Sequence, residues 1–196
     1  MPRIAPLPRE RLGYLEEQFK QAEREGREIP NFVRTLAHRP EIQKAHSALR
    51  LAIIGPGTVD RELKNLVAQM ASASAGCNYC WAHNAGFADD MGIPEAKLDA
   101  FWDYERSPLY SPAERAALTV ARGASVVPNA VTDADFTELK RHFSDEQIVE
   151  IVAVIALFGF LNRFNDTMAT TLEERPINAA TRYLAPHGWA VGKHGA

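Results

Sequence analysis

Two cysteines stand three residues apart in the segment Gly76-Cys77-Asn78-Tyr79-Cys80, and the chain contains no others. A free cysteine thiol has a pKa near about 8.5, so it is a weak nucleophile at neutral pH unless its surroundings favour the thiolate. A helix N-terminus, a neighbouring histidine or cation, and a second thiol all lower that pKa. The spacing therefore predicts a reactive dithiol that cycles between two thiols and a disulfide.

The predicted elements would place this pair at the start of a helix. Ser74-Ala75-Gly76 predicts a break, and a helix is expected from Cys77 to Met91, with Gly92 in its C-cap position. Helical geometry puts Cys77 and Cys80 on one face, within reach of a disulfide. His83 follows one turn later on the same side, where its imidazole could carry a proton to or from a sulfur.

An acid behind the histidine would orient the imidazole, as in other sets of nucleophile, base and orienting group. Glu62 is the candidate for that acid, because it lies on the preceding predicted helix beside an apolar stripe. Two alternatives remain open. Glu62 would also suit a solvated position at a helix start, where the helix dipole favours an acid, and His83 could be a structural histidine.

Three further side chains are candidates for the walls of a substrate pocket. Tyr79 lies between the cysteines and Trp81 directly after them, so both are expected near the thiols, either as walls of the site or as core residues. Asn84 lies on the Cys80 face of the same helix. No local set of four ligands accompanies the two thiols and the histidine, which argues against a zinc site.

Apolar residues recur at helical spacing along the chain, and no stretch shows the alternation of a β-strand. Ser111, Thr132 and Ser144 each precede a predicted helix and carry an acid or amide three residues later, as in capping boxes. The stretch 151–161 is apolar nearly all round, which predicts a central helix. The predicted helices span residues 8–25, 41–54, 60–73, 77–91, 94–104, 111–124, 132–142 and 144–173.

These elements predict an all-α helical bundle in a single domain over residues 1–196. We expect an N-terminal helical extension over about residues 1–29 and an irregular tail over about 175–196. Asn162 and Asn165 repeat the spacing of the two cysteines, which suggests either an internal duplicated helical hairpin or chance. Asn162, Arg163 and Asn165 also lie among apolar residues, which predicts a buried polar network.

The composition excludes several classes of function. The 22 basic and 25 acidic residues are mixed along the chain and give a net charge of −3, so nothing points to nucleic acid or an anionic membrane. The longest apolar run, residues 151–161, is shorter than the roughly 20 residues that span a bilayer. The N-terminus lacks the apolar stretch of a signal peptide. Two closely spaced cysteines do not form a secreted disulfide scaffold, so we expect a cytoplasmic protein.

The segment Arg61-Glu62-Leu63, the helix after it, and the run from Gly76 to His83 together resemble the carboxymuconolactone decarboxylase/AhpD-like superfamily. The nearest branch is its peroxidase-related group. The segments 32–40, 143–147 and 162–165 also resemble the family, so the resemblance covers roughly residues 30–172.

The resemblance implies an all-α fold that forms homo-oligomers, whether dimers, trimers or hexamers. It also implies alkylhydroperoxidase activity on a small peroxide, with a dithiol or protein electron donor and no bound cofactor. Carried over, the family pattern makes Cys80 the attacking thiol and Cys77 the resolving thiol, with His83 and Glu62 as the proton relay. This chain departs from that pattern at three positions: Asn84 and Tyr79 stand where the family has histidines, and Asn65 stands where it has its glutamate.

Two other functions remain open from the sequence. One is a lyase of the carboxymuconolactone decarboxylase type, although decarboxylase members do not need a pair of cysteines. The other is a non-enzymatic, redox-sensing oligomer whose disulfide changes its assembly.

Overall fold

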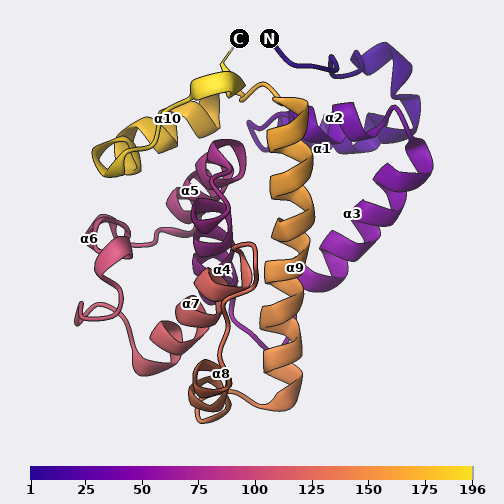
Figure 1. The fold of residues 1–196 in the computed structure, drawn as a ribbon. Coiled ribbons are helices and arrows are strands. Elements are labelled where there is room, and N and C mark those ends of the chain that lie inside the picture. The colour runs from indigo at the N-terminus through magenta and orange to yellow at the C-terminus, as the bar shows by residue number, and fades with distance from the viewer. Residues whose placement is uncertain (196) are drawn as a thin grey trace.

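The computed structural model describes residues 1–195, which form helices and 3-10 turns and contain no β-strand, as the sequence predicts. Figure 1 shows the long helix α9 (Asp145–Met168) at the centre of the molecule, with α1–α3 on one side and α4, α5 and α7 on the other. The remaining helices are α1 (Glu16–Arg24), α2 (Asn31–Leu36), α3 (Pro40–Ile54), α4 (Arg61–Ser74), α5 (Asn78–Met91), α6 (Glu95–Asp99), α7 (Pro112–Ala124), α8 (Asp133–Lys140) and α10 (Glu174–Tyr183).

The helix starts follow the predicted caps. Ser111, Thr132 and Ser144 each form a complete capping box, in which the side chain accepts the N3 amide and the N3 side chain accepts the cap amide. Gly92 ends α5 in the left-handed conformation, with a φ of 70°. Helix α9 is shorter than predicted, because Ala169 adopts a left-handed φ of 48° and ends it.

Helix α9 is the core helix of the bundle. It packs against α3, α4, α5 and α7, and its buried face carries Ile151, Val154, Leu157 and Leu161. Of the helices described, α9 is the one long and apolar enough to cross a membrane, and 44% of its most apolar window is buried inside the molecule. We interpret it as a core helix on the basis of this packing.

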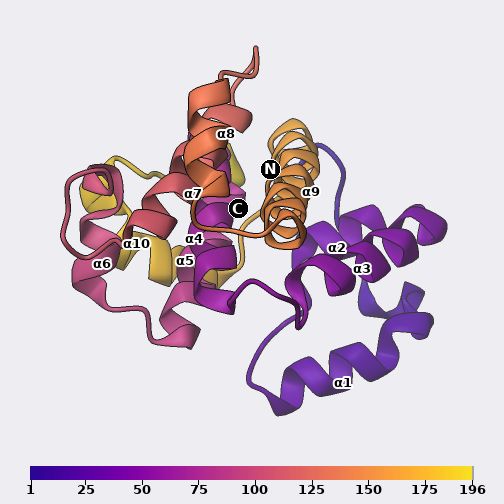
Figure 2. The same ribbon diagram turned by 90° about the horizontal axis from the view of Figure 1, so that it is seen from below.

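The N-terminal region forms a small satellite cluster beside the bundle. Leu7, Leu12 and Leu15 pack against Ala37 at the end of α2, and α1 follows along the outside (Figure 2). The predicted N-terminal extension is therefore helical in part.

The prediction of an irregular tail is wrong. Residues 174–183 form α10, which packs closely on α5. Pro176 does not interrupt α10, because it lies in the first turn, where its missing N–H is not needed. The apolar face of α10 buries Ala180 and Tyr183 in the same cluster as the two cysteines.

The structure does not support a duplicated hairpin built on Asn162 and Asn165. Cys77 and Cys80 stand at the start of α5, whereas Asn162 and Asn165 lie in the interior of the single helix α9. The shared spacing therefore has no shared structural position.

A buried ion pair ties the α3–α4 loop to α9. Lys64, with a side chain only 2% exposed, pairs with Glu150 and donates to the carbonyls of Ile53 at 2.9 Å and Gly55 at 2.8 Å. The Glu150 carboxylate also accepts the amide of Thr58 at 2.8 Å. Burial alone would raise the pKa of Glu150, but the bonds from Lys64 and Thr58 lower it to about 2. This anchor fixes the start of α4.

Candidate active site

Cys77 is the N-cap residue of α5. Gly76 takes a φ of 70°, which turns the chain out of α4, and Cys77 is extended, with φ −91° and ψ 94°. Its Sγ accepts the backbone N–H of Cys80 at 3.5 Å. The sulfur thus occupies the position of a capping oxygen, facing the unpaired amides and the positive end of the helix dipole.

The two thiols ionise differently. Both are free and buried, with exposed fractions of 0% for Cys77 and 4% for Cys80. The pKa of Cys77 is lowered, chiefly because the Cys80 thiol donates to its sulfur and despite its burial, with help from the amides at the helix start. Burial raises the pKa of Cys80 well above its ordinary value, and the proton that it gives to Cys77 raises it further. The arrangement favours a thiolate on Cys77 and a thiol on Cys80.

An amide from α9 contacts the second sulfur. Asn165 Nδ2 lies 3.6 Å from Cys80 Sγ and donates to it, and Asn162 donates to the carbonyl of Ala71 at 3.2 Å. Both asparagines are buried, as predicted. Arg163 is not part of this network, because it is exposed and donates to the carbonyl of Gly159 in its own helix.

His83 is paired with a buried carboxylate, Glu173. His83 Nε2 lies 2.8 Å from Glu173 Oε2, and the Glu173 side chain is only 2% exposed. The other Glu173 oxygen accepts the Tyr79 hydroxyl at 3.1 Å and the backbone N–H of Asn31. Burial alone would raise the pKa of Glu173, but the bond and charge of His83 and the Asn31 amide hold it below its ordinary value. Glu173 therefore orients the imidazole as a carboxylate.

The expectation that Glu62 serves His83 is wrong. Glu62 lies in the first turn of α4, about 18 Å along the helix axis from the end that leads to Cys77. Its side chain is 43% exposed and pairs with Lys97 at 2.7 Å. Glu62 is therefore the solvated acid at a helix start that the sequence left open as the alternative.

Amides occupy the two positions where the family pattern has its glutamate and histidine. Asn65 donates to the backbone carbonyl of Asn84 at 3.0 Å, and Asn84 Nδ2 donates to the hydroxyl of Ser72 at 3.3 Å. Gln69 completes the network by donating to Asn65 at 2.9 Å. These buried amides join α4 to α5, but they do not titrate near neutral pH, so they cannot act as a proton relay.

The two aromatic candidates lie on different sides of α5. The Tyr79 ring lies 4.6 Å from the His83 ring between centroids, and its hydroxyl bonds to Glu173. Burial raises the pKa of Tyr79 well above its ordinary value, so it remains a neutral donor. Trp81 is rotated by about 160° from His83 around the helix and packs edge-on against Trp102 at 5.9 Å. Tyr79 thus contacts the His83–Glu173 pair, whereas Trp81 packs in the core.

The segment after α10 covers the start of α5 and accounts for the burial of Cys77. Trp189 Nε1 donates to the carbonyl of Asn78 at 3.0 Å, and the Asn78 side chain donates to the carbonyl of Ala190 at 2.9 Å. His194 is 1% exposed, and burial lowers its pKa.

Within residues 1–195, no three His, Cys, Asp or Glu side chains gather closely enough to hold a metal ion.

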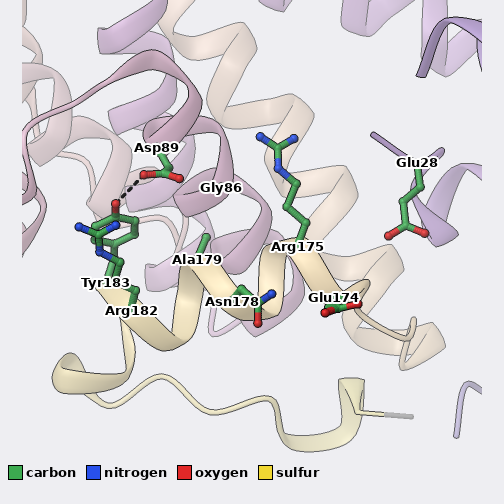
Figure 3. Close-up of a pocket in the computed structure, with 9 residues that line it drawn as sticks. All are labelled: Glu28, Gly86, Asp89, Glu174, Arg175, Asn178, Ala179, Arg182 and Tyr183. Carbon is green, nitrogen blue, oxygen red and sulfur yellow. Dashed lines mark hydrogen bonds between the residues drawn. The ribbon is translucent and has the colours of Figure 1, made fainter. Parts of the chain in front are cut away.

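A cleft opens beside His83 and Glu173. It has a volume of about 310 Å³ and lies between the linker at residues 26–30, the middle of α5 and the start of α10. A second hollow of about 430 Å³ adjoins it and is shown in Figure 3, where Glu28 stands on its own segment, away from the α10 residues. Sequence reasoning missed Glu173 and Glu28, because both reach the site through contacts that are distant in the sequence.

Comparisons with known proteins agree with this architecture. Residues 40–123 match the carboxymuconolactone decarboxylase family. The crystal structure of the debrominase Bmp8 is 33% identical, with a TM-score of 0.83, and the match covers 92% of this chain and 97% of that one. A cysteine-to-alanine variant of Bmp8 in complex with 2,3,4-tribromopyrrole is 32% identical, with a TM-score of 0.84 and coverage of 92% and 96%.

Two further proteins are similar to this chain. The AhpD core of an uncharacterized peroxidase-related protein from Ralstonia eutropha is 26% identical, with a TM-score of 0.71 and coverage of 87% of this chain and 88% of that one. The uncharacterized protein YnjA of Escherichia coli is 34% identical over 110 residues, which are 56% of this chain and 60% of that protein. The match thus spans less than two thirds of YnjA.

Proposed function

The chain belongs to the carboxymuconolactone decarboxylase/AhpD-like superfamily, and from this premise we propose an enzyme that reduces a small electrophile through a Cys77–Cys80 dithiol/disulfide cycle. The observation that carries the proposal is the position of Cys77 as the N-cap of α5, with the amide and the thiol of Cys80 both donating to its sulfur. A thiolate that is stabilised in this way, with a second thiol beside it, suits two-electron reduction.

An organic hydroperoxide is the substrate class that we place first. The Cys77 thiolate attacks the distal oxygen, an S–O bond forms, the O–O bond breaks, and the alkoxide leaves and takes up a proton. The Cys80 thiol then condenses with the resulting sulfenic acid, which releases water and forms the disulfide. The sum is one hydroperoxide and two thiols giving one alcohol, one water and one disulfide. A dithiol or protein donor reduces the disulfide for the next cycle.

This order assigns the attack to Cys77, whereas the family resemblance implies Cys80. The lowered pKa of Cys77 and the raised pKa of Cys80 support this exchange of roles, because the thiolate is the nucleophile and the protonated thiol condenses later. His83 supplies the proton of the departing alkoxide and is oriented by Glu173. Asn65 and Asn84 hold α4 against α5 and take no part in proton transfer.

Reductive dehalogenation is the second candidate, favoured by the similarity to the debrominase Bmp8 over nearly its whole length. A carbon–bromine bond would be replaced by a carbon–hydrogen bond, and bromide and a proton would be released. The two thiols supply the two electrons and become the disulfide, so the same donor closes the cycle. A decarboxylase reaction has less support, because it gives the dithiol no role.

Steady-state turnover separates these candidates. The assay supplies cumene hydroperoxide or 2,3,4-tribromopyrrole to the reduced protein with excess dithiothreitol, and follows alcohol or bromide release. We expect Cys77→Ser to abolish turnover of the true substrate, whereas Cys80→Ser still consumes one equivalent of hydroperoxide in a single turnover. Full activity of Cys77→Ser would sink the proposal. Absence of turnover together with an oxidation-dependent change of assembly would instead favour a redox-sensing oligomer.

A further inference from the structure

The cleft beside His83 has walls that suit an apolar molecule. Phe87 from α5, Pro30 from the linker and Pro176 from α10 supply its apolar lining, and His83 and Glu173 lie at one end. Its volume of about 310 Å³ lies at the lower end of the range of roughly 300–1,000 Å³ for small-molecule sites. The space therefore suits a compact organic body rather than a nucleotide or a peptide.

The cationic side chains around the cleft are already paired. Arg27 contacts the carboxylate of Glu25 at 3.1 Å, and Arg175 pairs with Asp90 on α5. Figure 3 shows the Arg175 side chain extending away from Glu174 and Glu28. Each guanidinium therefore already has an acidic partner in this structure.

A free hydrogen-bond acceptor remains in the cleft. The Glu28 carboxylate makes no hydrogen bond or ion pair with any residue of the described chain, and it lines both hollows. Glu173 is a carboxylate, and its Oε2 lies 2.8 Å from His83 Nε2. The other ring nitrogen of His83, Nδ1, makes no hydrogen bond within residues 1–195.

The charge around this acceptor is negative. Partial burial raises the pKa of Glu28, and the negative charges of Glu173 and Glu174 raise it further. The charges of Arg34 and His83 act in the opposite direction on Glu28. An anionic ligand would meet two carboxylates, whereas a neutral donor would meet two acceptors.

We propose that this cleft binds the organic part of the substrate, and that the substrate is a small, uncharged molecule with an apolar body and one N–H or O–H donor. The donor hydrogen-bonds to the Glu28 carboxylate, while the body packs between Phe87 and the two prolines. This proposal rests on the proposed function and narrows its substrate class. The proposal excludes peroxides and organohalides that carry a carboxylate from the substrate class. Hydrogen peroxide has no apolar body, so it would not make the contacts with Phe87 and the prolines.

The position of the cleft relative to the thiols fits this role. His83 lies three residues after Cys80 and six after Cys77, so it is about one helical turn from the resolving thiol and about 9 Å along the axis of α5 from the attacking one. The thiols are buried and do not line the cleft. His83 is thus the residue of the cleft that shares a helix with the dithiol.

Unreactive probes test this inference directly. Phenol, anisole and benzoate share a ring but present a neutral donor, no donor and an anion, respectively. Their dissociation constants are measured by ligand-observed NMR on the reduced wild-type chain and on Cys77→Ser, neither of which turns these probes over. We expect phenol to bind at least about tenfold more tightly than anisole, because a hydrogen bond to a charged acceptor is lost in anisole. Benzoate is expected to bind most weakly.

A pair of matched variants locates the site. Glu28→Met removes the free acceptor and should weaken phenol about tenfold, leave anisole unchanged and strengthen benzoate. Glu174→Met makes the same replacement in the adjoining hollow, outside this cleft, and should leave phenol and anisole unchanged while strengthening benzoate less than Glu28→Met does. The inference is overturned if phenol does not bind, if anisole or benzoate binds as tightly as phenol, or if the two variants behave alike. Binding requires no turnover, so this result and the test of the dithiol cycle are independent.

Discussion

Replacing Glu173 by glutamine tests whether this residue, rather than Glu62, is the buried partner of His83. The Glu173 carboxylate is 2% exposed and pairs with His83 at 2.8 Å, while its other oxygen accepts the Tyr79 hydroxyl at 3.1 Å and the Asn31 amide. Glutamine keeps the size of the side chain and one acceptor oxygen. It removes the charge and presents an amide where His83 meets a carboxylate.

The size of the effect follows from these contacts. A hydrogen bond to a charged group contributes about 1.5–3 kcal/mol, against about 1 kcal/mol for a neutral one. Weakening the bonds to Tyr79 and Asn31 and losing the pair with His83 should lower the free energy of unfolding by about 2–3 kcal/mol. The same substitution at Glu62, whose side chain is 43% exposed and pairs with Lys97, should cost about 0–1 kcal/mol.

Urea unfolding followed by far-ultraviolet circular dichroism measures the free energy of unfolding of both variants. In thermal unfolding of a chain of this length, a loss of about 2–3 kcal/mol corresponds to a decrease in Tm of roughly 4–12 °C. If Glu173→Gln is no less stable than Glu62→Gln, the assignment of Glu173 as the buried partner is wrong.

The pH dependence of the same difference gives a second test. The pKa of Glu173 is lower in the folded state than its ordinary value of about 4.3, so folding favours the carboxylate. The stability that this preference contributes is fully present above that ordinary value, and it is lost as the pH falls through the lowered pKa. The gap between wild type and Glu173→Gln should therefore narrow below about pH 4. A gap that widens on acidification would contradict a carboxylate at this position.

Three further changes test other parts of the structure. His83→Gln should slow turnover by about 100-fold or more, since a positioned acid or base contributes about 10²–10⁴; an unchanged kcat in the steady-state assay would argue against a proton-transfer role. Asn165→Leu removes the amide that donates to Cys80 Sγ at 3.6 Å, so the pKa of Cys80 should rise further. Absorbance titration of Cys80 in a Cys77→Ser background measures this pKa, and a lower value would refute the contact. Gly57→Ala places a Cβ against the Glu150 carboxylate, which must shift from its position in the buried ion pair with Lys64. Urea unfolding should then show a loss of about 3 kcal/mol, and a loss below about 0.5 kcal/mol would mean that the anchor is not needed.

The features that depend on neighbouring residues were predictable from the sequence. The capping boxes at Ser111, Thr132 and Ser144 join residues three apart, so their side chains alone identify them. The position of Cys77 at the start of α5 was predictable for the same reason, because a glycine and a short break precede it.

The features that depend on tertiary packing were not predictable in this way. Glu173 reaches His83 only because α10 folds back onto α5, and nothing near Glu173 in the sequence indicates a partner. Glu62 looked suitable because it lies beside an apolar stripe, but its place in the first turn of α4 directs it to Lys97. Helix α10 itself was missed because its apolar face, with Ala180 and Tyr183, is matched only by the surface of α5.

The most direct test of the central claim is a thiolate titration of the two single-cysteine variants, followed by absorbance near 240 nm. In Cys80→Ser, the serine keeps a donor beside the sulfur, and the pKa of Cys77 should lie below the free value of about 8.5. In Cys77→Ser, the pKa of Cys80 should lie well above that value, because its thiol is buried. The opposite order, with Cys80 the more acidic thiol, would contradict the assignment of Cys77 as the attacking thiolate.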